Sequence, residues 1–414
     1  MSSPQAFVHA LLPSASRFNQ MILTNARLIL PDGLRDGLEI VVAGGKIAEI
    51  RERAAREALD LGGNYLAPGF VDLHVHGALG RDTMEASPDV FRAICSHHAT
   101  GGTTSLLLTT VTASCPKIAN VLQAVREFGN QNNQIVGVHV EGPFISRARA
   151  GAQRADFICD PSPEETAPLF PFMDVIRRVT LAPELAGALD FIEQLGERGV
   201  SVSGGHSDAW DEEARAGFER GMRSVTHTFN CMSSMRRRGI ERVAGLLEVA
   251  LSEPTISCEL IADGHHVSPT LMKLLYRAKG RTGICLVSDA TAGAGLPNGT
   301  RFEVGGRDCV TAEGVCRLAD GSALAGSSSR MIDLVRMVVS SVGVPLHEAI
   351  RMATMNPAAA IGLEKRKGAL IPGADADFVV LSPELHVLQT YVAGECVYSA
   401  SGDARATAQS GIRS

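Results

Sequence analysis

Residues able to bind a metal ion or transfer a proton stand at the ends of several apolar stretches of this chain. The first stretch reads FVDLHVHGALG and carries two histidines one residue apart, His74 and His76. Side chains i and i+2 of a strand point to the same side, so both imidazoles can bind one ion. An isolated pair of this kind is also commonly two polar residues at a strand end, and further donors are needed to decide.

Four further donors follow later apolar runs, namely Glu141, His206, His227 and Asp289. Histidine and carboxylate ligands suit Zn²⁺ or Fe²⁺. Taken singly, each residue has an ordinary structural explanation: His206 as a turn histidine, His227 as a core histidine, and Asp289 as a helix N-cap before Ala-Thr-Ala. Taken together, the six residues favour a metal site with an acid/base carboxylate beside it.

The elements that must position these residues are alternating strands and helices. Eight candidate strands are interleaved with helical stretches, a pattern typical of βαβ units and a parallel sheet. The candidates are YLAPGFVDLHVH, TTSLLLTT, QIVGVHVE, IRRVTLAPE, VSVSGGH, SVTHTF, TISCELIAD and GICLVSD. The sequence therefore predicts an α/β fold with a (β/α)8 TIM-like barrel over residues 67–369, with the active site at the C-terminal strand ends.

Both ends of the chain show short β patterns instead. Residues 21–66 and 370–399 contain alternating strand segments with Gly-Gly and Pro-Asp-Gly turns. Each segment is too small to fold alone, so we expect one small β-sandwich domain built from both chain ends. Residues 1–20 are expected to form a loose N-terminal extension and residues 400–414 a C-terminal tail.

Composition excludes several classes of partner. The 414 residues carry 39 basic and 45 acidic side chains, a formal charge of −6, which gives no reason to expect nucleic acid or an anionic membrane. No apolar run approaches the ~20 residues of a membrane helix. The opening segment lacks the basic region of a signal peptide, and the nine cysteines include no Cys-x-x-Cys. We therefore expect reduced thiols and a cytoplasmic location.

The chain also resembles a known family. It is similar to the amidohydrolase superfamily and, within it, to the N-acetylglucosamine-6-phosphate deacetylase family. The motifs that carry this resemblance are PGFVDLHVHG, HVEGPF, SGGHSDA, THTFNCM, IADGHHV, LVSDATAG, LAGSS and MNPAAAIGL with KGALIPGADADFVVL. They run from about residue 60 to 381, and HVEGPF, DGHHV and SDATAG are the most specific of them.

The resemblance implies hydrolysis of the acetamide of a phosphorylated N-acetylamino sugar, giving glucosamine 6-phosphate and acetate. Glu141, His206 and His227 match the family's metal ligands, and Asp289 matches its general base and acid. Because the chain also keeps His74 and His76, the resemblance implies two divalent ions, Zn²⁺ or Fe²⁺, bridged by Glu141. Such an ion lowers the pKa of water from about 15.7 towards ~7 and so provides a nucleophile at neutral pH.

The family also implies substrate contacts and a partner subunit. The positions that match its sugar and phosphate contacts are Asn230, Cys231, Asp263, His266, Leu324, Ala325 and Gly326. The LAGSS stretch has an alternative explanation as a small-residue helix entry capped by Ser327. A homodimer is implied, because the arginine that binds the phosphate normally comes from the neighbouring subunit.

Two departures from the family pattern leave the sugar open. After EGPF the family usually has Gly-x-His, and this chain has Gln153 in place of the histidine. The segment after THTFNCM reads SSMRRRGIERVAG, in which Arg238 is the best match to the phosphate-binding arginine, although the spacing is one residue longer. Another acetylated hexosamine, an N-acyl amino acid, or a non-catalytic barrel are the rival interpretations.

Overall fold

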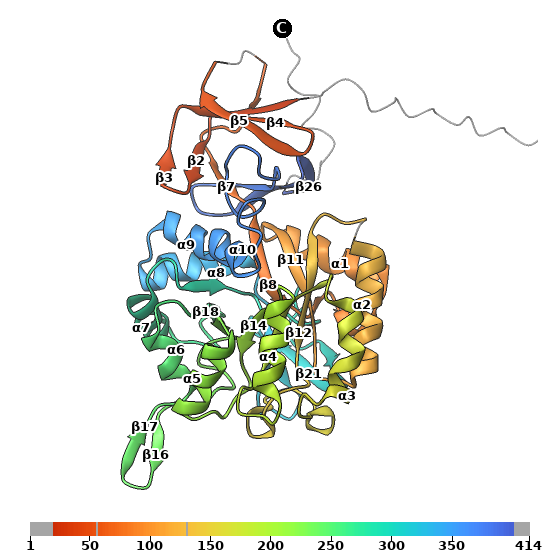
Figure 1. Cartoon of the computed structure of the whole chain (residues 1–414). Coiled ribbons are helices and arrows are strands. Elements are labelled where there is room, and N and C mark those ends of the chain that lie inside the picture. The colour runs from red at the N-terminus through yellow and green to blue at the C-terminus, as the bar shows by residue number, and fades with distance from the viewer. Residues whose placement is uncertain (1–19, 55–56, 130, 401–414) are drawn as a thin grey trace, which may run out of the picture.

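Eight parallel strands form the central barrel (Figure 1). The computed structural model describes residues 20–54, 57–129 and 131–400, so most of the predicted N-terminal extension and C-terminal tail lies outside the described residues. In chain order the strands are β8 (Phe70–Val75), β11 (Thr103–Thr110), β12 (Ile135–Glu141), β13 (Ile176–Leu181), β14 (Ser201–Gly204), β15 (Ser224–Val225), β18 (Ser257–Leu260) and β19 (Ile284–Leu286). A parallel bridge from Val75 to Ala290 joins the last strand region to the first. The predicted barrel is confirmed.

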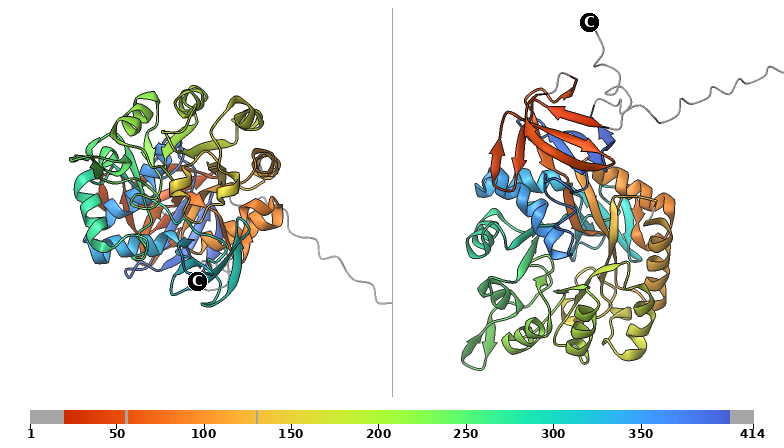
Figure 2. Two further views of the ribbon diagram at one scale, coloured as in Figure 1. Left: turned by 90° about the horizontal axis from the view of Figure 1, so that it is seen from below. Right: turned by 45° about the horizontal axis from the view of Figure 1, so that its top comes forward.

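Helices surround the barrel, as the view from below shows (Figure 2). Helix α2 illustrates why they pack there, because its residues Ile118, Val121, Leu122 and Val125 follow the helical repeat and are all buried. The helices are α1 (Pro88–Ala99), α2 (Cys115–Gly129), α3 (Pro163–Thr166), α4 (Ala188–Glu197), α5 (Asp211–Arg220), α6 (Leu246–Ser252), α7 (Pro269–Lys279), α8 (Met331–Met337), α9 (Leu346–Ala353) and α10 (Met355–Ala360). The short turns of helix are η1 (Thr83–Glu85), η2 (Arg147–Arg149), η3 (Ala155–Phe157), η4 (Ala167–Phe172) and η5 (Val338–Val342).

The two chain ends together form a β-sandwich above the barrel (Figure 1). One sheet has the order β5-β4-β1-β6 and the other β26-β25-β24-β7-β2-β3. Their bounds are β1 (Met21–Thr24), β2 (Arg27–Leu30), β3 (Gly33–Arg35), β4 (Leu38–Ala43), β5 (Lys46–Glu52), β6 (Leu59–Asp60), β7 (Tyr65–Pro68), β24 (Phe378–Leu381), β25 (Val387–Val392) and β26 (Glu395–Ser399). Side chains from both ends share one core, for example Leu23, Leu28, Phe378 and Tyr391.

The junction between sandwich and barrel is a single residue. The predicted strand YLAPGFVDLHVH is in fact two strands, β7 in the sandwich and β8 in the barrel, with Gly69 between them. A Cβ atom on Gly69 would lie 2.1 Å from Oγ1 of Thr104, so the tight crossing requires glycine. The first metal-ligand strand therefore starts directly at the sandwich.

Three smaller β units decorate the barrel. They are the ladder of β9 (Gly77–Ala78) with β10 (Arg81–Asp82), the hairpin of β16 (Arg236–Arg238) with β17 (Glu241–Val243), and a sheet of β20 (Arg301–Val304), β21 (Arg307–Ala312), β22 (Val315–Leu318) and β23 (Leu324–Ser327). The LAGSS segment is thus a strand, and the helix-entry alternative is wrong. Ser327 Oγ donates to the carbonyl of Ser288, and the next helix begins at Met331 with Arg330 at its N-cap.

The nine cysteines are all free thiols. Within the described ranges, none of the helices combines the length and apolar character that crossing a bilayer requires.

Candidate active site

The predicted site residues lie where barrel strands end. His74 lies within β8 and His76 follows it directly, Glu141 is the last residue of β12, and the other three follow their strands by two or three positions. His206, His227 and Asp289 adopt left-handed backbone with φ of 47°, 31° and 47°. Non-glycine residues in this conformation are uncommon and cluster at functional sites, because the surrounding structure must hold them there. The turn after each strand thus aims its side chain into the barrel mouth.

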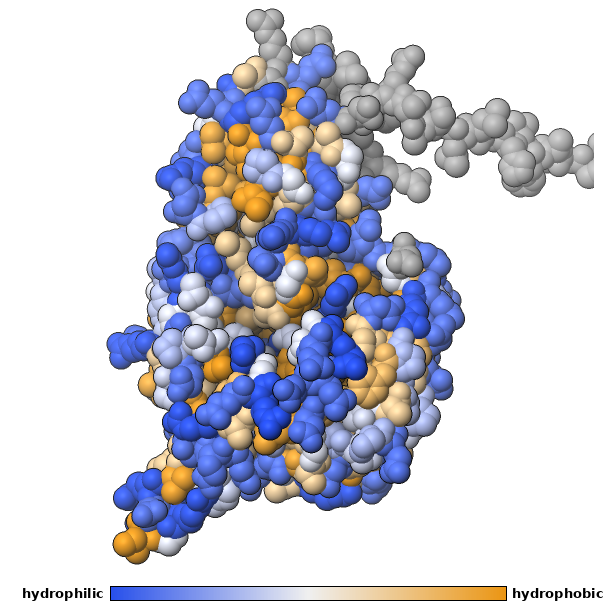
Figure 3. Space-filling model, in the orientation of Figure 1, coloured by the Kyte–Doolittle hydropathy of each residue, from blue (hydrophilic) through white to orange (hydrophobic). Residues whose placement is uncertain are grey.

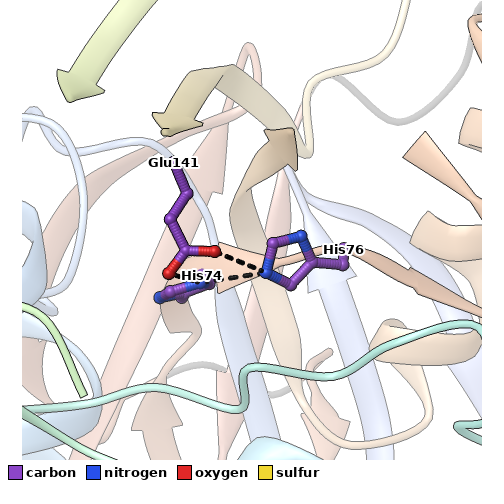
Figure 4. A group of neighbouring side chains, drawn as sticks. All are labelled: His74, His76 and Glu141. Atoms are coloured by element: carbon purple, nitrogen blue, oxygen red, sulfur yellow. Dashed lines mark hydrogen bonds and ion pairs between the residues drawn. The ribbon is translucent and has the colours of Figure 1, made fainter. Parts of the chain in front are cut away.

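Four imidazole nitrogens converge on the carboxylate of Glu141. Its Oε1 lies 3.1 Å from Nε2 of His227 and 3.3 Å from Nε2 of His206. Its Oε2 lies 3.3 Å from Nε2 of His76, and Oε1 lies 3.5 Å from Nε2 of His74. Figure 4 shows how His74, His76 and Glu141 lie relative to one another. Two sets of three donors with mutual distances within 4.8 Å share this carboxylate: His74, His76 and Glu141, and Glu141, His206 and His227.

The histidine tautomers suit metal ligation. A ring nitrogen that faces an acceptor carries the proton, which leaves the other nitrogen free to bind a cation. Three of the four histidines have Nδ1 directed at an oxygen: His74 at Glu259 Oε2 (3.2 Å), His206 at the carbonyl of Arg149 (2.8 Å) and His227 at the carbonyl of Asn230 (3.2 Å). Within each group the Nε2 atoms face each other at 3.1 Å. This donor set fits divalent cations.

Burial and charge shape the acidity of the group. Burial would raise the pKa of Glu141, but the nearby His74, His206 and His227 outweigh it and hold the pKa well below its usual range. Burial would lower the pKa of His76, but hydrogen bonds to Asp289 and Glu141 raise it to about 9. Without a cation His76 therefore retains its extra proton at neutral pH, and a bound metal ion would displace it.

Asp289 stands beside the first group. Its Oδ1 lies 3.4 Å from Nε2 of His74 and 3.3 Å from Nε2 of His76. Burial would raise its pKa, but the charge of His74 and the hydrogen bond to His76 lower it, so the side chain is a carboxylate at neutral pH. No helix of the described chain begins at Asp289, so the N-cap explanation is wrong.

A cavity of about 230 Å³ opens over these ligands. Besides the metal ligands, its walls include the predicted contacts Gln153, Asn230, Cys231, His266, Leu324, Ala325 and Gly326. Gly326 has a φ of 71°, and a Cβ atom there would lie 2.6 Å from the carbonyl of Asp289. Glycine is therefore required where the β23 segment passes the backbone of Asp289.

Asp263 acts on the cavity through His266. Its Oδ2 lies 2.6 Å from Nδ1 of His266, and its Oδ1 accepts the backbone amide of the same residue at 2.8 Å. Burial would lower the pKa of His266, but this hydrogen bond and the charges of Asp263 and Asp289 raise it above 6.5. The cavity wall thus holds an imidazole that Asp263 orients and whose positive charge it favours.

Gln153 contacts the metal-ligand group directly. Its Nε2 donates to Oε2 of Glu141 at 2.6 Å, and its Oε1 accepts the backbone amide of Thr112 at 2.8 Å. The side chain therefore supports the shared carboxylate as well as lining the cavity.

The structure does not bring Arg238 to this cavity within one chain. The arginine lies on the β16–β17 hairpin, which projects from the body (Figure 1), and pairs with Glu212 at 2.7 Å. Arg236 instead fixes the base of the hairpin: it contacts Asp208 Oδ1 at 2.7 Å and lies over the ring of Trp210. Figure 3 shows apolar colour at the projecting tip, where Ile240 is 93% exposed.

Sequence reasoning missed three residues near the site. Arg178 and Glu259 form a buried ion pair beneath His74, and Arg154 lines the cavity. The signal for the pair was available, because IRRVTL and SCELIAD each place a charge inside an apolar strand. Arg154 offered no comparable pattern.

Most of this chain matches a known protein family. The model of the amidohydrolase family matches residues 65–397. N-acetylglucosamine-6-phosphate deacetylase of Lysinibacillus sphaericus is 34% identical over 387 residues, covering 91% of this chain and 97% of the relative. N-acetylgalactosamine-6-phosphate deacetylase of Escherichia coli O157:H7 is 35% identical over 379 residues, covering 90% and 98%.

A solved structure agrees with these sequence matches. The crystal structure of N-acetylglucosamine-6-phosphate deacetylase from Pasteurella multocida superimposes with a TM-score of 0.86 at 32% identity. It covers 91% of this chain and 99% of that chain. The likeness therefore includes both the barrel and the sandwich.

Proposed function

Because the chain belongs to the amidohydrolase family, and within it to the N-acetylglucosamine-6-phosphate deacetylase family, we propose that it hydrolyses N-acetylglucosamine 6-phosphate to glucosamine 6-phosphate and acetate. The observation that carries this proposal is the convergence of four imidazoles on Glu141 with Asp289 alongside. A second carboxylate beside a shared metal-binding carboxylate is the arrangement that metal-assisted hydrolysis needs.

The proposed cofactor is two divalent cations, Zn²⁺ or Fe²⁺. His74, His76 and Glu141 would hold one, and Glu141, His206 and His227 the other. When bound, such a cation supplies a Lewis acid that polarises the amide carbonyl and acidifies water. The fixed Nδ1 contacts of His74, His206 and His227 support this assignment, because they hold each Nδ1 against an oxygen and direct the Nε2 atoms of these rings towards Glu141, where a cation would bind.

Asp289 is the proposed general base and acid. Its carboxylate would accept a proton from the attacking water as the new C–O bond forms, and would then donate it to the amide nitrogen as the C–N bond breaks. The products are acetate and the free amino sugar. The lowered pKa of Asp289 supports the first step, because the group must be deprotonated to accept the proton.

Sugar and phosphate contacts complete the proposal. His266, oriented by Asp263, would donate to the substrate, and Asn230, Cys231 and the segment 324–326 would line the sugar. For the phosphate we propose Arg238 of a second copy of this chain in a homodimer. The projecting hairpin with its apolar tip supports this assignment, since such a tip suits a protein contact.

N-acetylgalactosamine 6-phosphate is a second candidate substrate. The relative from Escherichia coli O157:H7 that is named for N-acetylgalactosamine 6-phosphate is as similar as those named for the glucosamine compound. Gln153, at a position where the family usually has a sugar-contacting histidine, also favours an altered preference. Deacetylation of N-acetylgalactosamine 6-phosphate is therefore the alternative substrate assignment.

We propose domains at 21–66 with 370–399 and at 67–369, supported by the shared core of the two chain ends. A reducing location such as the cytoplasm is supported by the nine free thiols.

Acetate release from a panel of compounds tests the function. N-acetylglucosamine and N-acetylgalactosamine, each with and without 6-phosphate, and one N-acyl amino acid are incubated with zinc-loaded and chelator-treated protein. We expect kcat/KM to be highest for a 6-phosphorylated sugar and turnover to disappear on chelation. Equal rates for the unphosphorylated sugars would overturn the phosphate assignment, and undiminished activity after complete metal removal would overturn the metal mechanism.

A further inference from the structure

Two opposite charges lie inside the barrel, beneath the metal-ligand groups. Arg178 comes from β13 and Glu259 from β18, and each is 1% exposed. Nη2 of Arg178 lies 2.9 Å from Oε1 of Glu259. The guanidinium also donates to three serine hydroxyls, those of Ser201 (3.3 Å), Ser203 (3.0 Å) and Ser224 (2.8 Å). Since burial of two charges is costly, the pair calls for a role that an apolar pair of similar volume would not fill.

The second oxygen of Glu259 contacts both metal-ligand groups. Oε2 lies 3.2 Å from Nδ1 of His74, which belongs to the first group. The same oxygen accepts the backbone amide of His227, which belongs to the second group, at 3.2 Å. One buried carboxylate therefore holds a side chain of one group and the backbone of the other.

The contact with His74 determines what that ring can do. A carboxylate accepts hydrogen bonds only, so Nδ1 of His74 carries the proton and Nε2 is left free. The ring of His139 packs edge-on against His74 at 4.6 Å between centroids and limits its rotation. Turning the ring would leave the Glu259 charge buried without this partner.

We propose that Glu259, fixed by Arg178, is a positioning residue that sets the tautomer and orientation of His74 and thereby makes the first group able to hold a cation. The inference rests on the proposed metal centre. It predicts an unequal effect on the two groups, because the imidazole of His227 keeps its own Nδ1 contact with the carbonyl of Asn230. Loss of Glu259 should therefore weaken cation binding by the group of His74 and His76 more than cation binding by the group of His206 and His227.

Zinc titration of folded variants tests the proposal. Zinc per chain is measured by equilibrium dialysis and mass spectrometry for wild type, Glu259→Gln, His76→Asn and the double variant. We expect Glu259→Gln to weaken about 10- to 100-fold the zinc-binding step that His76→Asn removes, as loss of a carboxylate behind a ligating histidine does in other sites. In the His76→Asn background the first group is already incomplete, so Glu259→Gln should cause a smaller loss of zinc affinity there than in the wild-type background.

A matched control separates positioning from stability. Asp377→Asn breaks another buried ion pair, between Asp377 and Lys367 at 2.6 Å, and should lower thermal stability while leaving zinc binding unchanged. Equal zinc affinity in wild type and folded Glu259→Gln would overturn the inference but leave the metal centre standing. Absence of zinc binding in wild type would overturn the metal centre itself.

A measurement on the wild-type protein keeps the proposal testable if Glu259→Gln does not fold. Nitrogen NMR of protein labelled at histidine, with His74→Gln used to assign the signal, reports which ring nitrogen of His74 carries the proton. We expect Nδ1 to be protonated in the zinc-loaded protein. A deprotonated Nδ1 would overturn the inference.

Discussion

The side-chain amide of Gln153 joins Glu141 Oε2 to the backbone amide of Thr112, through hydrogen bonds of 2.6 and 2.8 Å. Gln153 is therefore expected to affect metal binding as well as the sugar. Gln153→Met keeps the length of the side chain and removes both hydrogen bonds, so we expect zinc affinity to fall about 10-fold or more. Arg154→Met, a change in the same wall of the cavity, is the control. An unchanged zinc affinity with a raised KM would limit Gln153 to substrate contact.

Glu141 belongs to both metal-ligand groups, whereas His76 belongs to one. We therefore expect Glu141→Gln to lower zinc occupancy in both groups, and His76→Asn to remove about one equivalent, since each histidine serves one ion. Zinc per chain, measured after dialysis against a fixed free concentration, distinguishes the two results. Equal losses in the two variants would contradict the shared role of Glu141.

Asp289→Asn removes the proposed proton acceptor and keeps the shape of the side chain. Turnover should fall roughly 10²- to 10⁴-fold, the usual contribution of a general acid or base, while zinc in the group of His206 and His227 is retained. Acetate release and metal content are measured on the same preparation. Turnover close to that of wild type would remove Asp289 from the mechanism.

The alkaline side of the pH profile should depend on Asp263. The pKa of His266 is raised in the folded protein, so its positive charge, and the stability it contributes, are present below pH 6.5 and are lost as pH rises through the raised pKa. Asp263→Asn removes the partner that raises this pKa. We expect the alkaline limb of kcat/KM to move to lower pH in this variant.

The neighbouring residue provides the control for that shift. His265 is exposed, and His265→Asn should leave the limb in place. A limb that stays unmoved in Asp263→Asn would assign it to a group other than His266.

The arginine that binds the phosphate should be found on the hairpin of a second subunit. Arg238→Ala is expected to raise KM for the 6-phosphorylated sugar about 10-fold or more, in line with the loss of a charge-assisted hydrogen bond, and to leave KM for the unphosphorylated sugar unchanged. Arg237→Ala is the matched control on the same strand.

Two outcomes would revise this assignment. A raised KM in Arg154→Ala instead of Arg238→Ala would assign the phosphate to the arginine in the cavity wall of the same chain. A monomer by analytical ultracentrifugation at assay concentration would exclude a contact between subunits.

Most of the site could be predicted from the sequence because its residues stand at the ends of apolar strands. His74, Glu141 and His227 each follow or end an apolar run, and parallel strands in a closed barrel direct these ends to one mouth. The barrel, the sandwich and the family are confirmed. A charge inside an apolar strand marks Glu259 as unusual, but spacing along one strand cannot show what lies across the barrel, so its contact with His74 could not be predicted.

Two other structural features could not be predicted from the sequence, for different physical reasons. The two strands of the hairpin around Arg238 are short and mostly charged, so they show no alternation of apolar and polar residues that would predict a strand. The segment Leu324–Ser327 is a strand because it pairs with β22. This pairing joins two separate segments of the chain and does not follow from the local propensity of the residues.

The crossing at Gly69 has a consequence for biosynthesis. β7 pairs with β2 on one side and with β24 on the other, and β24 ends at Leu381. The N-terminal part of a chain leaves the ribosome first, so one edge of β7 stays without its neighbour until β24 has emerged as well. The strand that carries His74 is thus anchored at its sandwich end only after the barrel segments and β24 have been synthesised, and a nascent chain stalled before β24 would expose a sheet edge open to aggregation.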